Sequence, residues 1–134
     1  MSEPLDMFDL DCAARTVWGE ARGEPAEGRL AVAFVIANRY RAGKTSLQAV
    51  CEKPFQFSCR NKDDPNEPLL RAVTYDDLTL RDCLAAVLAS IDPRAVDPTS
   101  GSRHYHTTAT KAWWAAGRQP IATIGGHAFY NDVA

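Results

Sequence analysis

The stretch Trp18-Gly19-Glu20-Ala21-Arg22-Gly23-Glu24-Pro25 separates two helical patterns and decides how the chain is arranged. Before it, residues 10–17 carry apolar side chains at three- and four-residue spacing, which predicts a helix. After it, a second helix is predicted from Pro25 to about Arg41, because proline suits the first turn of a helix. Glycine and proline are unfavourable inside helices, so the first helix is expected to end near Glu20 or Ala21.

Glu20 is therefore placed at the C-terminus of a helix, beside Trp18 and ahead of an apolar segment. The negative end of the helix dipole and apolar surroundings both disfavour an ionised carboxylate. A carboxyl group that keeps its proton is what general acid catalysis requires. We predict Glu20 as a catalytic acid, with a solvated turn residue as the alternative. Glu24 and Glu27 are weaker candidates, because Glu24 precedes a proline and Glu27 complements the dipole of the second helix.

Length and composition limit the classes of protein that this chain can belong to. A chain of 134 residues with 46% hydrophobic content predicts a single domain over residues 1–134, in which residues 1–8 form a loose lead-in. The net charge of −2 argues against nucleic acid as a partner. The longest apolar run closes at Asn38 and is too short to span a membrane, so no membrane insertion is expected. A monomer is expected.

The fold class follows from the pattern of the remaining segments. The second helix is apolar on all sides from Leu30 to Ala37, which predicts a buried central helix. The fold is therefore predicted as α+β and mainly α, with a small C-terminal β region. The other expected segments are a helix at 47–52 capped by Ser46, a strand or ordered loop at 55–59, a surface loop at 60–68, a helical turn at 69–75, a helix at 80–91 capped by Thr79, and strands at 104–108, 121–124 and 127–130. Asp9 is expected to cap the first helix.

The four cysteines do not define a metal or redox motif. Cys12 and Cys83 fall on predicted helix faces and are expected to be small buried side chains. Cys51 and Cys59 flank a short aromatic segment, and a disulfide between them is left open. Such a bond would require an oxidising compartment.

Two further sets of side chains suggest functions. His104 and His106 would share one face of a strand and, with His127, predict a zinc amidase or peptidase with Glu20 as its base, as one alternative. Flat aromatic faces with amide and hydroxyl groups suit a glycan, which leaves a non-catalytic glycan-binding module as a second alternative. That set comprises Gln56, Phe57, Ser58, Tyr105, Trp113, Trp114, Phe129 and Tyr130.

Four motifs, in order over residues 10–130, resemble those of the cell wall hydrolases that include the spore cortex-lytic enzymes. They are TVWGEARGEPAEGRLAVAFVIANR at 16–39, QFSC at 56–59, DPTSG at 97–101 with HYH at 104–106, and IGGHAFY at 124–130. The resemblance implies a lysozyme-like domain acting on peptidoglycan, with Glu20 as the catalytic acid. It also implies glycan binding by Gln56, Phe57, Ser58, Tyr105, His106, His127 and Tyr130, and it implies neither a metal nor a cofactor.

The expected reaction is cleavage between N-acetylmuramic acid and N-acetylglucosamine, as a lytic transglycosylase or, in a close variant, as a muramidase. A two-carboxylate hydrolase needs a second acid about 5 to 9 Å away. The available candidates, Asp63, Asp64 and Asp97, lie in predicted loops, which favours the transglycosylase. The first ten residues show no signal-peptide pattern. A phage-type enzyme is therefore expected, cytoplasmic as synthesised and acting on the wall after release or delivery.

Overall fold

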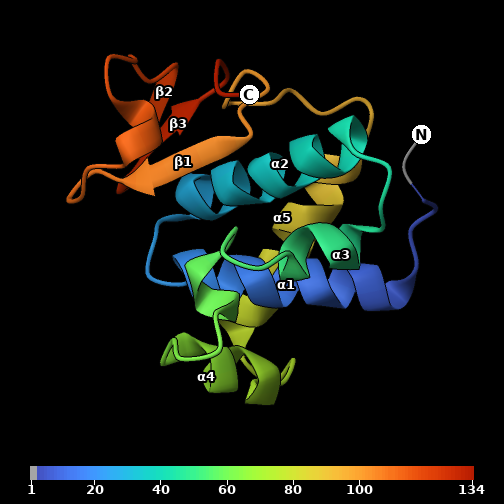
Figure 1. Cartoon of the computed structure of the whole chain (residues 1–134). Coiled ribbons are helices and arrows are strands. Elements are labelled where there is room, and N and C mark those ends of the chain that lie inside the picture. Colours follow the sequence, from blue (N-terminus) through green and yellow to red (C-terminus); the bar gives the residue numbers. More distant parts are fainter. Residues whose placement is uncertain (1–2) are drawn as a thin grey trace.

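The computed structural model describes residues 3–134, so the first two residues of the predicted lead-in lie outside the described part. The fold is mainly helical with a small antiparallel sheet, as the sequence predicts (Figure 1). The helices are α1 (Met7–Ala21), α2 (Ala26–Ala42), α3 (Leu47–Glu52), α4 (Asn66–Ala72) and α5 (Leu78–Ile91), with 3₁₀ helices at Ser58–Arg60 and Trp113–Ala115. The strands are β1 (His104–Thr107), β2 (Ala122–Ile124) and β3 (His127–Tyr130).

The core lies where α1, α2 and α5 pack against one another. Every residue from Ala31 to Ala37 is buried, which confirms the predicted central helix. A helix that is apolar on all sides keeps its side chains away from water only if other elements pack against every side of it. Over residues 3–134, no helix combines the length and the apolar character needed to cross a membrane.

Two helices begin earlier than predicted, because each is capped by an aspartate that precedes the predicted capping residue. Asp6 caps α1, accepting a hydrogen bond from the Asp9 N–H while the Asp9 side chain accepts one from the Asp6 N–H. This reciprocal capping box makes Asp9 the third helical residue, so the predicted lead-in of residues 1–8 is too long. In α5, Asp77 and not Thr79 caps the helix, by accepting from the Leu80 N–H.

The segment after α3 is an ordered loop and not a strand. It turns through Phe55, whose φ is 64°, buries the Phe57 side chain and continues into the 3₁₀ helix. The predicted surface loop at 60–68 is shorter than expected, because the Asp64 side chain accepts from the Asn66 N–H and starts α4 there.

The three strands form a sheet of order β1-β3-β2, with β3 in the centre and fully buried. β1 and β2 both pair antiparallel to β3, with Tyr105 opposite Phe129 and Ile124 opposite His127. These strands lie within a residue of their predicted positions. Figure 1 shows the sheet and α4 on opposite sides of the helical layer.

Candidate active site

Glu20 lies in the last turn of α1, where three hydrogen-bond donors meet its carboxylate. Oε2 accepts from the Ser58 hydroxyl at 3.2 Å and from the Cys59 N–H at 3.0 Å. Oε1 accepts from the Tyr105 hydroxyl. The site therefore joins α1, the 3₁₀ helix Ser58–Arg60 and β1, and it brings together three residues that the sequence predicted for it.

Gly19 explains how the 3₁₀ helix comes close enough to α1. A Cβ atom at this position would lie 2.9 Å from the Cβ and Sγ atoms of Cys59 and 2.9 Å from Leu70 Cδ2. Real Cβ atoms do not approach other heavy atoms this closely, so only glycine allows Cys59 to pack directly on α1. This contact places the Cys59 N–H at Glu20, a main-chain interaction that no side-chain motif could have indicated.

The protonation of the groups around Glu20 is set by burial. Burial and the charge of Glu20 raise the pKa of Tyr105 well above 10, so its hydroxyl keeps its proton at neutral pH. Burial also raises the pKa of the Cys59 thiol, with Glu20 adding to the effect. Cys59 is therefore a neutral thiol and not a nucleophile.

Glu24 has a different task, which is to hold the β2–β3 hairpin. Its Oε1 accepts from the Gly126 N–H at 2.5 Å and lies 3.7 Å from His127 Nδ1. Gly125 has a φ of 57°, and a Cβ there would collide with the Glu24 carboxylate. The carboxylate therefore occupies the space next to the two glycines, which have no side chains there. Only the Gly-Gly pair could have indicated this contact from the sequence.

The three histidines belong to two paired strands, and two of them, His104 and His106, pack against the same Trp114 ring. His106 Nε2 is 2.9 Å from the Tyr130 hydroxyl, while His104 lies against the Trp114 ring with centroids 5.4 Å apart. His127 meets Tyr105 edge-on at 4.9 Å, and burial lowers its pKa. Across residues 3–134, no group of three or more His, Cys, Asp or Glu side chains is placed to hold a metal ion. The structure thus does not assemble the donor set that a zinc amidase needs.

The residues predicted to bind glycan divide into surface and core. Gln56 and Ser58 are exposed, and Tyr105 and His106 are half-buried. Phe57, His127 and Tyr130 are buried, so their side chains expose little surface to a ligand. Arg39 is the last residue of the motif at 16–39, and the sequence predicts no role for it at the site. In the structure its guanidinium lies 4.8 Å from the centroid of the Phe57 ring and donates to Gln56 Oε1 at 3.1 Å.

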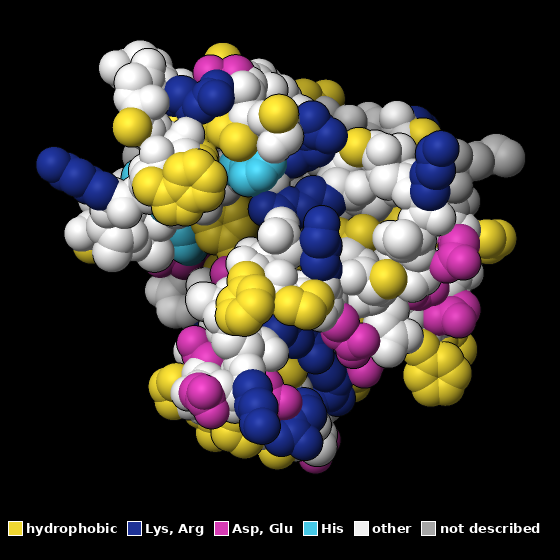
Figure 2. All heavy atoms as spheres, viewed as in Figure 1, with side chains coloured by type: hydrophobic (Ala, Val, Ile, Leu, Met, Phe, Trp, Pro, Cys, Tyr) yellow, Lys and Arg dark blue, Asp and Glu magenta, His cyan; other side chains and the backbone are white. Residues whose placement is uncertain are grey.

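Figure 2 shows the surface near this site as a hollow between the sheet and the corner of α2 and α3, with a histidine and Lys and Arg side chains along it. On the far side of β1, a second pocket is lined by His106, Trp113 and Tyr130, among others. Trp113 is 89% exposed and forms part of the rim of this pocket.

All four cysteines are free and buried. Cys59 Sγ lies 3.7 Å from the Thr16 carbonyl oxygen, against α1. Cys51 instead contacts Cys12, and this contact together with burial raises the pKa of Cys51. The disulfide left open between Cys51 and Cys59 is not formed, because the two side chains have different neighbours.

Solved structures with this arrangement of helices and sheet are catalytic domains of enzymes. The catalytic domain of the Bacillus cereus SleB protein matches with a TM-score of 0.76 and 28% identity, covering 98% of this chain and 95% of that one. The catalytic domain of the germination-specific lytic transglycosylase SleB from Bacillus anthracis matches with a TM-score of 0.70 and 28% identity, covering 98% and 100%. The chain therefore has the fold of these two catalytic domains.

Residues 23–130 match the model of the Cell Wall Hydrolase family, and the chain belongs to this family. The spore cortex-lytic enzyme of Halalkalibacterium halodurans is 34% identical over 128 residues, which are 92% of this chain and 34% of that protein. The spore cortex-lytic enzyme of Bacillus subtilis is 35% identical over 130 residues, covering 90% and 37%. The chain thus spans about a third of the length of these relatives. The family resemblance is confirmed, and Glu20 lies just before the residues that match the family model.

Proposed function

We propose that this protein cleaves peptidoglycan glycan strands between N-acetylmuramic acid and N-acetylglucosamine, as a lytic transglycosylase with Glu20 as its single acid–base group. Two comparisons support the proposal: the relatives are named spore cortex-lytic enzymes, and one structural neighbour is titled a lytic transglycosylase.

The observation that carries the proposal is the chemical type of the three donors to Glu20. The Cys59 N–H can only donate, so it keeps Oε2 as an acceptor. The Ser58 and Tyr105 hydroxyls can either donate or accept. The carboxyl group can therefore keep its position both with and without its proton, as a residue that acts first as acid and then as base must do.

In the first step, protonated Glu20 gives its proton to the glycosidic oxygen, and the bond from this oxygen to C1 of the muramic acid breaks. In the second step, the Glu20 carboxylate takes the proton of the 6-hydroxyl of the same sugar while that oxygen bonds to C1. The sugar ends as a 1,6-anhydro ring and Glu20 is protonated again. Because the nucleophile belongs to the sugar, one carboxyl group suffices. In a muramidase, water would replace the 6-hydroxyl.

Two of the three aspartates considered as a second acid, Asp97 and Asp64, are engaged in other hydrogen bonds. Asp97 accepts from the Asn38 side chain at 2.8 Å, from the Thr99 N–H at 2.8 Å and from the Gly101 N–H at 2.8 Å. Burial alone would raise the pKa of Asp97, but these hydrogen bonds outweigh it and the pKa is lowered. Asp64 starts α4, and Asp63 is exposed in the loop before it. These engagements favour the one-carboxylate mechanism.

Mass spectrometry of digested sacculi tests the proposal. We expect muropeptides that end in anhydro-muramic acid, in equal yield with and without a metal chelator. Reducing muramic acid ends would instead identify a muramidase, and reducing N-acetylglucosamine ends would show that the wrong bond had been assigned. Released peptides, lost on chelation, would contradict glycan cleavage altogether.

A further inference from the structure

A pocket of about 740 Å³ adjoins the Glu20 site, between the end of α2, α3 and the start of β1. Gln56 and Arg39 belong to its wall, and Gln56 lies two residues before Ser58, which contacts Glu20. The pocket is of a size that holds a small ligand or a few residues of a peptide. It is therefore a continuation of the groove that leads to Glu20.

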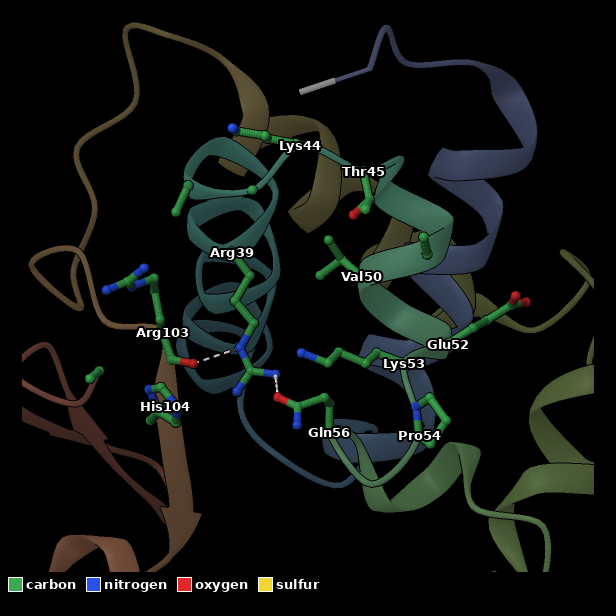
Figure 3. Close-up of a pocket in the computed structure, with 14 residues that line it drawn as sticks. Arg39, Lys44, Thr45, Val50, Glu52, Lys53, Pro54, Gln56, Arg103 and His104 are labelled. Atoms are coloured by element: carbon green, nitrogen blue, oxygen red, sulfur yellow. Dashed lines mark hydrogen bonds between the residues drawn. The ribbon is translucent and has the colours of Figure 1, made fainter. Parts of the chain in front are cut away.

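The charged side chains of this pocket are almost all cationic. Its lining includes the basic residues Arg39, Lys44, Lys53 and Arg103, whereas Glu52 is its one acidic side chain. In Figure 3 the Lys53 side chain points towards Arg39, and the Glu52 side chain points away from it. This concentration of positive charge contrasts with the net charge of −2 for the whole chain.

These cations are not neutralised by the protein. Over residues 3–134, none of the four forms an ion pair with a carboxylate. Arg39 donates instead to two neutral groups, the Arg103 carbonyl oxygen at 2.6 Å and Gln56 Oε1 at 3.1 Å (Figure 3). Burial lowers the pKa of His104 in the pocket wall, and the charges of Arg39 and Arg103 lower it further. Arg39 is half-buried, whereas Lys44, Lys53 and Arg103 are exposed. A half-buried cation without a paired carboxylate favours an anionic ligand, and exposed cations around it add to the local positive potential.

Gln56 adds a donor of fixed direction to this set. Its Oε1 accepts from Arg39, which leaves the two N–H groups of Nε2 as donors. Guanidinium, ammonium and amide groups together are the donors that bind carboxylates in proteins. The donors of the pocket thus suit a carboxylate on a substrate whose glycosidic bond lies at Glu20.

The substrate carries such carboxylates in one place. The N-acetylated sugars of a peptidoglycan strand are neutral, and the lactyl carboxyl of muramic acid is consumed in its amide bond to the stem peptide. The ionised acids therefore lie on that peptide, which projects from the sugar whose bond Glu20 would break. We propose that the pocket binds a carboxylate of the stem peptide and makes the enzyme prefer strands whose peptide carboxyls are ionised. This inference rests on the proposed function.

The test uses two matched tetrasaccharide fragments, each with two stem peptides. In one fragment the peptide carboxyls are free, and in the other they are converted to amides. We expect wild-type kcat/KM to be about tenfold or more higher for the free acids, the effect of one charge-assisted hydrogen bond. Binding to the inactive Glu20→Gln protein should show the same preference as a ratio of Kd values, and this preference should weaken at high salt.

Substitutions identify the pocket as the source of the preference. Lys53→Gln combined with Arg103→Gln should bring the ratio close to one, and circular dichroism and thermal unfolding would show that the fold persists. Lys62→Gln, which removes an exposed charge outside the pocket, should leave the ratio unchanged. Equal cleavage of both fragments by the wild type would overturn the inference while leaving the proposed function intact. A wild type that cleaves neither fragment would contradict the proposed function itself. Inhibition by inorganic phosphate with no carboxylate preference would assign the pocket to a phosphate.

Discussion

At the scale of single residues, the candidate active site is built around the carboxyl group of Glu20, which accepts hydrogen bonds from two hydroxyls and one main-chain N–H. The sequence predicted Glu20, Ser58 and Tyr105, because each belongs to a recognisable motif, and the structure places all three in contact. It missed the Cys59 N–H, because a main-chain donor is present at nearly every position and is selected only by the fold. It also missed Arg39, whose importance depends on Gln56 reaching it from another segment.

Glu20→Gln should remove the transferable proton while keeping the size of the side chain. Acid–base catalysis contributes about 100- to 10,000-fold, so we expect kcat to fall by this factor with little change in thermal stability. Turnover of sacculi and the melting temperature are the two measurements. Glu27→Gln, an exposed change in the first turn of α2, serves as the control and should stay near wild type. A nearly normal Glu20→Gln with an inactive Glu24→Gln would move the acid to Glu24.

At the scale of elements, the close approach of the 3₁₀ helix to α1 is the feature on which the site depends. Element positions were predicted well where the apolar pattern is long, as in α2, and where a single serine caps a helix, as in α3. The starts of α1 and α5 were predicted wrongly, because each is preceded by several residues able to cap it. Which of them is used depends on hydrogen-bond geometry that the pattern does not encode.

Gly19→Ala tests this close approach. Alanine favours the helix by about 1 kcal/mol, but its Cβ would press on Cys59 and Leu70, and overpacking costs about 1 to 3 kcal/mol. The 3₁₀ helix would then move away from Glu20, and displacements near 1 Å can cost roughly 100-fold in rate. We expect kcat/KM to fall roughly 10- to 100-fold, with a modest loss of stability by chemical denaturation. Gly23→Ala is the matched control, since no heavy atom lies within 4 Å of its added Cβ. Equal activity of the two variants would show that the contact is dispensable.

At the scale of the whole molecule, the helical layer and the sheet are held together at Glu20 and Glu24. Glu20 reaches β1 through Tyr105, and Glu24 reaches the β2–β3 turn through Gly126. Two histidines of the sheet, His104 and His127, are kept neutral in this region, because burial lowers the pKa of each. The stability of the whole domain should therefore depend on pH.

The sign follows from proton uptake on unfolding. A histidine whose folded pKa lies below its unfolded value of about 6.5 takes up a proton more readily in the unfolded chain. The free energy of unfolding should thus decrease as pH falls below about 6.5, by at most about 1.4 kcal/mol per pH unit for each proton. Urea unfolding at pH 7.5, 6.5 and 5.5 measures this slope, and His104→Gln should make it shallower. A stability that rises on acidification over this range would contradict it.

The three donors to Glu20 come from positions 38, 39 and 85 residues further along the chain. A ribosome therefore synthesises the acid early and completes its surroundings late. Until Tyr105 has been made and β3 has followed to hold β1, the growing polypeptide carries Glu20 without the hydroxyl that would fix its Oε1. On the proposed mechanism, catalytic competence would thus arise only after the helical layer has been synthesised, and incomplete translation products would be inert towards the wall.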